Sequence, residues 1–405
     1  MKEGWEYKEL GEITTSINGL WKGKKDPFVR VGVIRNANFT KDITLDFSKI
    51  EYLDVEEKQY KNRKLQKGDL IVEKSGGSEK QPVGRTVLFN SEGEFSVSNF
   101  TSILRINNQN EITPEFLYKY LLYIYKEGKT KEMQKATTGI HNIIYDKFLA
   151  ILIPILSLAE QQQIVSFLDS EFEKIEALKA NAETQLQAAK DLFQKALKEL
   201  LTPKEGWVEK QLGEVINNLR TGLNPRTHFK LNTPDAIYNY ITVRELKGFD
   251  IVADDKTDKV NEEALIRINK RSNLLIGDVL FSGTGTIGNT ALVTEEPKTW
   301  NIKEGIYALT PKHEIIDSKF LIYIISSDFF LNEAKKKAEG TGVKSIPMKR
   351  FVNLIIHLPD KHNQKQIVTH LDTLSAKVKQ LQDNYNETIT LCNDLKQSLL
   401  KKIFE

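Results

Sequence analysis

Two long stretches without a helix-breaking residue place the strongest limit on how this chain can fold. Residues 155–201 contain no proline or glycine, and a related stretch returns at residues 360–405, where Ile367 takes the place of Ile164. Apolar residues recur in both at steps of three and four, which puts one apolar stripe along a long α-helix. Such a stripe needs a partner to cover it. We expect the two helices to pack together as an intramolecular coiled coil; packing into separate domains or in a homodimer is the alternative.

The predicted seam uses side chains from both helices. At about 1.5 Å per residue, a helix of about 40 residues would be ~60 Å long, which is the length of a spacer between domains. The expected seam residues are Ile175, Leu178, Leu186, Phe193 and Leu200 in the first helix, and Leu374, Val378, Leu381, Leu395 and Leu399 in the second.

The remainder of the chain is duplicated as well, in motifs that keep their order. The matched motifs are a Gly-Trp opening with Leu-Gly-Glu at residues 4–12 and 206–214, a Gly-Asp pair at 68–69 and 277–278, and Thr-Gly-x-x-x-Ile at 138–143 and 341–346. Arg35 aligns with Arg244 in the same way. The loops between these motifs differ in length, which indicates one scaffold used twice.

Each half is expected to be a mixed α/β domain rich in strands. Short apolar or alternating runs, such as Phe95–Ile106, lie between Gly, Asn and Asp turns and favour a twisted antiparallel sheet or a partial barrel. One helix is predicted in each half, near Thr113–Tyr125 and Asp317–Lys337. The predicted class is α+β, with two similar globular domains separated by an antiparallel pair of long helices about a pseudo-two-fold axis. The expected boundaries are 1–154 and 204–358 for the globular domains, and 155–203 and 359–405 for the helices.

Composition excludes several classes of protein. Lysine and arginine total 58 against 55 acidic residues in a chain of 405, a balance that allows nucleic acid as a partner without requiring it. The single cysteine, Cys392, falls on an apolar stripe, so no disulfide framework exists and a cytoplasmic location is expected. The longest apolar run, Phe148–Leu156, is broken by Pro154, which argues against a membrane span or signal peptide.

One motif imitates a cofactor loop. Residues 283–288 fit Gly-x-Gly-x-x-Gly, the pattern of a dinucleotide or S-adenosylmethionine site. Such a site needs a helix after the glycines, whereas a strand-like run begins at Thr290, so a hairpin loop is the better interpretation. The six histidines show no metal-binding spacing, and no nucleophile, phosphate-binding or methyltransferase motif occurs. We therefore expect no cofactor, no metal and no catalytic residue.

Basic and polar residues in matching loops of both halves favour DNA as the ligand. Lysines can position a phosphate backbone, and Arg, Asn and Ser can contact base edges. A solvated surface is the commoner explanation for any one of them, but the set points to DNA. The candidates are Lys22, Lys24, Lys25, Arg35, Asn36, Lys74, Ser75, Lys80, Arg85, Arg220, Asn224, Arg226, Arg244, Ser282, Thr284, Asn289 and Lys344.

With its repeated motifs and the Glu160–Val165 helix start, the chain resembles the specificity subunit of type I restriction-modification systems over nearly its full length. The second copy departs from this start, with His362, Asn363 and Gln364 in its place. The resemblance implies two target recognition domains, each reading half of a bipartite double-stranded DNA site, with a coiled coil that fixes their separation. It also implies two methylation subunits, docked on the coiled coil, and restriction subunits as partners.

Three alternatives stay open from the sequence. The chain could belong to a related single-step restriction-methylation enzyme, or be a DNA methyltransferase that binds S-adenosylmethionine through Gly283–Gly288. It could also be a structural coiled-coil scaffold without a DNA role. A sequence-specific footprint would exclude the scaffold, and methylation by the purified chain alone would favour the enzyme.

Overall fold

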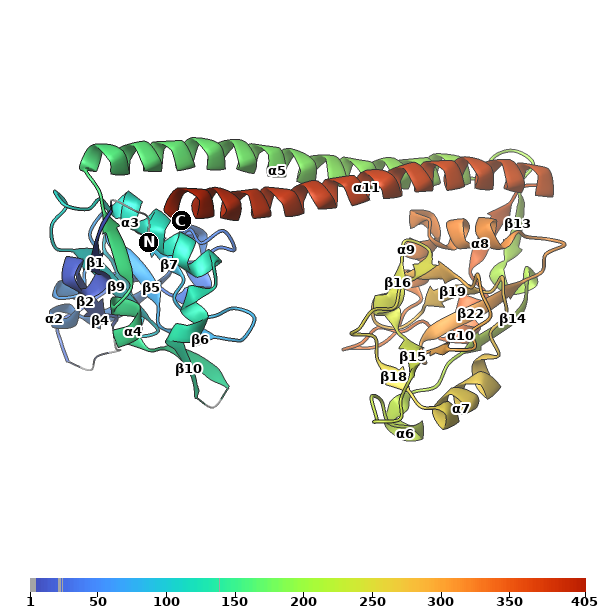
Figure 1. Ribbon diagram of the computed structural model, residues 1–405. Helices are drawn as coiled ribbons and strands as arrows, with labels where there is room; N and C mark the ends of the chain where they lie inside the picture. Colours follow the sequence, from blue (N-terminus) through green and yellow to red (C-terminus); the bar gives the residue numbers. More distant parts are fainter. Residues whose placement is uncertain (1–4, 21–22, 24, 138) are drawn as a thin grey trace. The chain divides into compact units, whose positions relative to one another are not determined.

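The computed structural model describes residues 5–20, 23, 25–137 and 139–405. Short strands and helices accompany two helices of 44 residues each, α5 (Leu158–Leu201) and α11 (Lys361–Phe404) (Figure 1), which confirms the α+β class. The chain divides into two compact units. The first unit is Met1–Glu183 with Asn386–Glu405, and the second is Thr184–Tyr385, so both long helices contribute to both units.

The first unit is built on a four-stranded antiparallel sheet in the order β2-β9-β5-β7. Its strands are β2 (Thr14–Asn18), β9 (Thr101–Ile106), β5 (Leu70–Glu73) and β7 (Thr86–Leu88). A second sheet, β4-β3-β8, contains a parallel pair, β3 with β8. Its strands are β4 (Glu51–Glu56), β3 (Phe28–Ile34) and β8 (Phe95–Val97). The remaining strands are β1 (Glu6–Glu9) with β12 (Leu152–Ile155), and β10 (Gln134–Thr137), β11 (Ile140–Ile143) and β6 (Ser75–Gly77).

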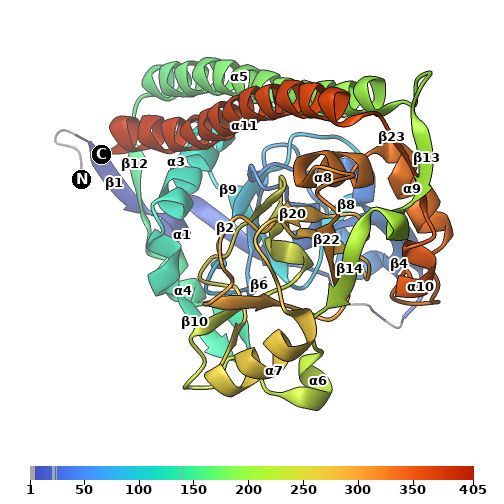
Figure 2. The ribbon, with the colours of Figure 1, turned by 90° about the vertical axis from the view of Figure 1, so that its right-hand side faces the viewer.

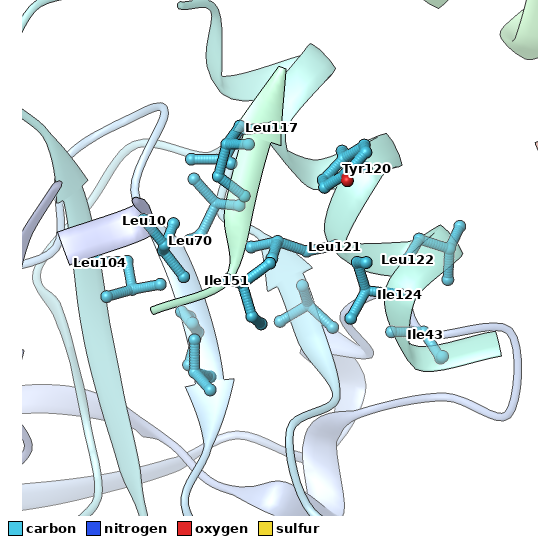
Figure 3. Close-up of a cluster of buried hydrophobic side chains, with 14 of the residues drawn as sticks. Leu10, Ile43, Leu70, Leu104, Leu117, Tyr120, Leu121, Leu122, Ile124 and Ile151 are labelled. Carbon is cyan, nitrogen blue, oxygen red and sulfur yellow. The ribbon is translucent and has the colours of Figure 1, made fainter. Parts of the chain in front are cut away.

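Helix α3 (Pro114–Lys126) covers the four-stranded sheet of this unit. The Thr113 side chain caps its first turn and Pro114 occupies the first turn, as the sequence predicts. Leu117 and Leu121 belong to one buried cluster with Leu70 of the sheet (Figure 3). Smaller helices complete the unit: α1 (Leu10–Ile13), α2 (Glu57–Lys61) and α4 (Tyr145–Leu149).

The second unit repeats this topology. Its four-stranded sheet has the order β14-β22-β19-β20, and the sheet β18-β15-β21 again contains one parallel pair, β15 with β21. The strands are β14 (Ile216–Thr221), β22 (Ile306–Pro311), β19 (Val279–Ser282), β20 (Thr290–Leu292), β18 (Lys259–Val260), β15 (Tyr238–Ile241) and β21 (Trp300–Ile302). The others are β13 (Val208–Gln211) with β23 (Ile355–Leu358), and β16 (Leu246–Lys247) with β17 (Asp250–Ile251). The helices are α6 (Pro225–His228), α7 (Glu262–Ser272), α8 (Ser318–Ile325), α9 (Asp328–Lys336) and α10 (Met348–Phe351).

Several predicted elements need correction. The run Phe95–Ile106 is two strands in different sheets, because the chain turns between β8 and β9. The helix predicted at Asp317–Lys337 is two helices, since the Ser327 side chain caps a new first turn at Phe330. Helix α7 was not predicted, although Asn261 caps it and its apolar residues have helical spacing. The four-stranded sheets are antiparallel, as predicted, whereas the sheets β4-β3-β8 and β18-β15-β21 each contain one parallel pair.

The Gly-Asp motifs form the same turn in both units. Gly68 and Gly277 have φ angles of 93° and 89°, in the left-handed region that favours glycine. The following carboxylates, Asp69 and Asp278, are buried and each accepts a backbone N–H of its own turn. The duplicated dipeptide therefore encodes a turn with a buried charge.

The long helices pack side by side and antiparallel within each unit. In the first unit the start of α5 lies with the end of α11, and in the second unit the end of α5 lies with the start of α11 (Figure 1). One set of buried positions recurs at steps of seven residues or a multiple of seven, typical of a coiled coil. The set is Leu168, Ile175, Ala182 and Ala189 in α5, and Leu371, Val378 and Cys392 in α11.

Three of the predicted seam residues lie outside the seam. Leu178, Leu381 and Leu395 are 51%, 39% and 48% exposed. Each lies three residues after a buried seam residue. The seam continues instead with the residue four positions on, which is Lys179 after Ile175 and Lys396 after Cys392. The stems of both lysines are largely buried while their charges pair with Asp42 and Glu176. Ile175, Phe193 and Val378 are buried, and Leu186, Leu200, Leu374 and Leu399 are partly buried. The Phe193 ring packs against Phe249 and Tyr323 of the second unit.

A fully buried glutamine fastens the start of α5 to the first unit. The Gln161 side chain donates from Nε2 to the carbonyls of Glu111 (2.8 Å) and Leu156 (2.9 Å), and its Oε1 accepts from the Thr113 N–H (2.9 Å). It therefore joins the loop before α3, the strand before α5 and the helix itself. We refer to this arrangement as the helix clasp.

Gln364 forms the same clasp at the start of α11. Its Nε2 donates to the carbonyls of Ile315 and Pro359, both at 3.0 Å, and its Oε1 accepts from the Asp317 N–H at 3.1 Å. The second copy of the helix start therefore keeps the one glutamine that is buried. Its differences fall on exposed positions such as 362 and 363.

Candidate nucleic-acid interface

In the first unit, three segments that are far apart in the sequence meet beside the end of β5. Strand β6 follows β5 and pairs antiparallel with β11, the second half of the Thr-Gly motif. Asn36, which follows β3, donates from Nδ2 to the Ser75 carbonyl. We refer to residues 35–36, 74–77 and 140–143 as the first corner. The hairpin of β10 and β11 lies at the end of the unit away from α5 and α11 (Figures 1 and 2).

The second unit brings the corresponding segments together. The Gly285 N–H donates to the Lys344 carbonyl (2.9 Å), and the hydroxyls of Thr284 and Ser345 are 2.8 Å apart. The Ile346 N–H donates to the Gly283 carbonyl (2.9 Å). We refer to residues 242–244, 283–286 and 341–346 as the second corner.

A cavity of about 330 Å³ opens at the second corner. Its lining includes two cations, Arg244 and Lys303, and two carboxylates, Asp258 and Glu304. Arg244 donates to Asp258 at 3.0 Å, and its side chain is 58% exposed. The cavity thus offers both donors and acceptors, the two kinds of group that base edges present in the major groove.

The alignment of Arg35 with Arg244 is wrong by two residues. Arg35 is the N-cap of the short 3-10 helix η1 (Asn36–Asn38) that follows β3. Its counterpart is Thr242, the N-cap of η5 (Val243–Glu245) after β15. Arg244 belongs to the same corner but to a different position, because the two strands and their loops differ in length.

The corners gather part of the predicted DNA-binding set. Arg35, Asn36, Lys74 and Ser75 lie in the first corner, and Arg244, Thr284 and Lys344 lie in the second. The Lys74 ammonium donates to Asn18 Oδ1 at 2.7 Å, and burial lowers its pKa. Arg35 forms an ion pair with Glu51 at 2.8 Å.

Four other candidates hold the fold together instead. Arg85 pairs with the buried Glu73 at 2.7 Å; burial alone would lower the pKa of Arg85, but the hydrogen bond and charge of Glu73 raise it. Arg220 is buried against Asp278 at 2.6 Å. The Ser282 hydroxyl accepts the N–H groups of Gly288 and Asn289. The Asn289 side chain in turn donates to two backbone carbonyls.

The remaining candidates lie outside the corners as defined here. Lys25 and Lys80 are exposed in loops, and Arg226 is exposed on the short helix α6. Asn224 caps that helix by accepting the Arg226 N–H at 3.0 Å. Lys22 and Lys24 fall outside the described residues.

The glycine pattern at 283–288 is a hairpin loop, as the sequence favours. It connects β19 to β20, which pair antiparallel, so no helix follows the glycines. Within residues 5–20, 23, 25–137 and 139–405, no three His, Cys, Asp or Glu side chains are grouped closely enough to hold a metal ion. No helix in the same part of the chain is both long and apolar enough to span a bilayer.

The sequence did not single out two residues, one of the first corner and one of the cavity beside the second. His141 lies on β11 opposite Gly77 of the first corner, and Lys303 lines the cavity of the second. The repeated Thr-Gly motif could have found His141, since it marks the hairpin at the same place in each half. No sequence pattern marks Lys303, which reaches the cavity because β21 pairs with β15.

Comparison with known proteins accounts for both halves of the chain. The family profile described as the type I restriction modification DNA specificity domain matches residues 2–188 and again 204–391. The type I restriction enzyme StySPI specificity subunit of Salmonella potsdam is 25% identical, over 100% of this chain and 89% of that protein. The EcoBI specificity subunit of Escherichia coli is 24% identical, over 98% and 89%.

Solved structures share the fold. A chain from a type I R-M system superposes with a TM-score of 0.73 at 19% identity, covering 100% of this chain and 98% of its own. The HsdS subunit from Thermoanaerobacter tengcongensis gives 0.51 at 20% identity, covering 100% and 97%. Because the family profile matches twice and spans nearly the whole sequence, this chain belongs to the family of type I restriction modification DNA specificity subunits, which recognise DNA rather than catalyse a reaction.

Proposed function

We propose that this chain selects the DNA sequence for a type I restriction-modification complex in the cytoplasm. Two target recognition domains, residues 1–154 and 204–358, each read one half of a bipartite double-stranded site. The long helices, residues 155–203 and 359–405, set the separation of the half-sites. The observation that carries the proposal is the duplicated corner, where one scaffold presents different polar side chains to a ligand.

The proposed DNA contacts are corner residues and two exposed cations outside the corners. In the first domain these are Arg35, Asn36, Ser75 and Lys80, and in the second Arg226, Arg244, Thr284 and Lys344. Lys22, Lys24, Lys25, Lys74 and Asn224 are kept as backbone-positioning candidates. Arg85, Arg220, Ser282 and Asn289 are not among the proposed contacts, because each is engaged in an ion pair or hydrogen bonds within the fold.

The long helices also offer surface for partner subunits. Large apolar side chains remain exposed along both of them, and a docked partner would cover them. They are Phe167, Leu178 and Leu192 on α5, and Leu381, Leu391 and Leu395 on α11. We propose that two methylation subunits dock on these helices and that restriction subunits join the complex.

Methylation sequencing tests the assignment directly. The chain is co-expressed with its methylation subunits in a host that lacks other adenine methylation, and the genomic DNA is sequenced by a method that detects modified bases. One bipartite motif with a fixed spacer is expected. Assembly of a methylating complex that marks no bipartite motif would overturn the proposal.

Exchange of one domain tests its modularity. Replacing residues 1–154 by the matching domain of another specificity subunit is expected to change one half-site and leave the other intact. Deleting seven residues from each long helix, within 170–200 and 373–403, is expected to alter the spacer or abolish binding. A change in both half-sites after the domain exchange would contradict independent reading.

A further inference from the structure

The first corner contains buried polar atoms that have no hydrogen-bond partner. Among the described residues, six buried side-chain nitrogen or oxygen atoms lack a partner, and three of them, Arg35 Nε, Asn36 Oδ1 and His141 Nδ1, belong to this corner. Buried polar groups are nearly always paired, so each exception needs a cause such as an absent ligand. Three exceptions in one place point to a polar ligand that this corner is built to bind.

The amide of Asn36 is held at one end only. Its Nδ2 donates to the Ser75 carbonyl, which leaves one N–H and both lone pairs of Oδ1 for a ligand. A side-chain amide that offers one donor beside one acceptor matches the N6 amino group and N7 of adenine in the major groove. Its remaining hydrogen-bonding capacity therefore selects one base.

The backbone on one side of Asn36 leaves room for a base to approach. Gly76 is exposed, and among the described residues a Cβ placed there would meet only Asn36 Nδ2, at 3.0 Å. Asn36 Oδ1 is covered in the free protein, so binding requires the side chain to shift toward the ligand. That shift breaks no hydrogen bond at Oδ1, and the only side-chain bond it can strain is the one from Nδ2 to the Ser75 carbonyl.

The second corner has no such group of unpaired buried atoms among the described residues. Thr284 and Ser345 hydrogen-bond to each other at 2.8 Å, and Arg244 pairs with Asp258 at 3.0 Å. None of the unpaired buried atoms found in the described residues lies in that corner. The two corners therefore present different chemistry at the same place in the fold.

We propose that Asn36 is a specificity-determining residue that reads one adenine in the half-site of the first domain, with His141 hydrogen-bonding to the same or the adjacent base pair. This inference rests on the proposed function, because it assumes that the first corner faces DNA. It adds the base that is read and the side chains that read it.

The test replaces single atoms of the DNA. The full-length chain, assembled with its methylation subunits, is titrated with duplexes carrying the mapped site, in which each adenine of the first half-site is changed in turn to 7-deazaadenine, which lacks N7. We expect one position at which the native complex loses roughly tenfold in affinity. Asn36→Ala is expected to lose a similar factor on unmodified DNA and nothing further at that position.

Two further variants separate reading from folding. Asn36→Asp keeps the size of the side chain but offers only acceptors, so it is expected to prefer cytosine, which donates from N4, at the same position. His141→Ala is expected to relax the preference at that position or its neighbour. Asn90→Ala, an exposed amide outside the corner, serves as the control and is expected to behave as the native complex.

The outcomes distinguish this inference from the proposed function. If Asn36→Ala and the native complex respond equally to 7-deazaadenine at every position, Asn36 does not read adenine, although the chain still reads DNA. If the native complex binds no bipartite site at all, the proposed function itself fails. If both Asn36→Ala and Asn36→Asp lose all DNA binding, Asn36 maintains the structure of the corner and the inference is wrong.

Discussion

The buried aspartate of the Gly-Asp turn pairs with an arginine in both units, but the arginine comes from a different strand in each. Asp69 is paired with Arg105, which comes from β9, whereas Asp278 is paired with Arg220, which comes from β14. Thr310 occupies the place of Arg105 in the second unit and donates to Asp278 as well. The turn therefore requires a guanidinium beside its aspartate, but the neighbouring strand that supplies it can change.

The contacts between α3 or α8 and the long helices show the same freedom. Asp169 of α5 forms an ion pair with Lys119, a buried lysine. Asp372 of α11 accepts instead from the Tyr323 hydroxyl at 2.6 Å and pairs with Lys319. The helix clasps, by contrast, use glutamine in both units.

The largest effect is expected from breaking the buried ion pair of the second unit. Asp278→Ala leaves Arg220 buried without its counter-charge, which should cost about 3–5 kcal/mol of unfolding free energy. Asp69→Ala should cost less, because Arg105 is 29% exposed and can reach solvent. Urea unfolding followed by circular dichroism measures both. Asp54→Ala, which removes the exposed pair with Arg30, is the control and should change stability by less than about 1 kcal/mol.

A position swap sharpens the same comparison. Arg220→Leu combined with Thr310→Arg would rebuild the arrangement of the first unit in the second. The double variant is expected to regain about half or more of the stability lost by Arg220→Leu alone. Equal stability of the single and double variants would show that the two strands are not interchangeable as sources of the guanidinium.

The helix clasps are expected to contribute equally in the two units. Gln161→Ala and Gln364→Ala each remove three hydrogen bonds and leave buried backbone groups unpaired, at about 2–3 kcal/mol. Gln162→Ala, one residue away and exposed, should fall within about 0.5 kcal/mol of the native chain. A clear inequality between the two clasp variants, measured in the same urea titration, would contradict their equivalence.

The smallest expected effect is the pH dependence of the Tyr323–Asp372 contact, which the Lys119–Asp169 contact of the first unit does not share. Burial, and then the hydrogen bond to Asp372, raises the pKa of Tyr323. The folded state therefore keeps a proton that the unfolded chain loses near pH ~10, so the contribution is complete below ~10 and declines as the pH rises further. Tyr323→Phe should cost about 1 kcal/mol at pH 8, and the difference should shrink in unfolding titrations above pH 10.

A control for the pH effect lies on α11. Tyr385→Phe removes a phenol that has no hydrogen bond among the described residues, and should change stability by less than about 0.5 kcal/mol. A difference between native chain and Tyr323→Phe that stays constant from pH 8 to 11 would rule out the hydrogen bond as the source.

The sequence predicted the long helices and the duplicated motifs well, but it misjudged the seam. Leu178, Leu381 and Leu395 look like seam residues because leucine is apolar. The structure uses Lys179 and Lys396 there, because a long aliphatic stem can fill the seam while its charge finds a carboxylate elsewhere. The carboxylate Asp42 comes from a loop that no helical pattern could connect to α5.

Local order was determined by neighbouring residues and could be read from them. The absence of proline and glycine from residues 155–201, the Gly-Asp turns and the cap at Thr113 each depend on a few adjacent positions. Only the tertiary structure decided which polar side chains form ion pairs or hydrogen bonds within the fold and which keep unpaired groups for a ligand. Arg220 forms a buried ion pair with Asp278, while Asn36 donates to Ser75 of β6 and leaves its side-chain oxygen unpaired. Burial and hydrogen-bond partners depend on strands that are distant in sequence, and periodicity carries no information about them.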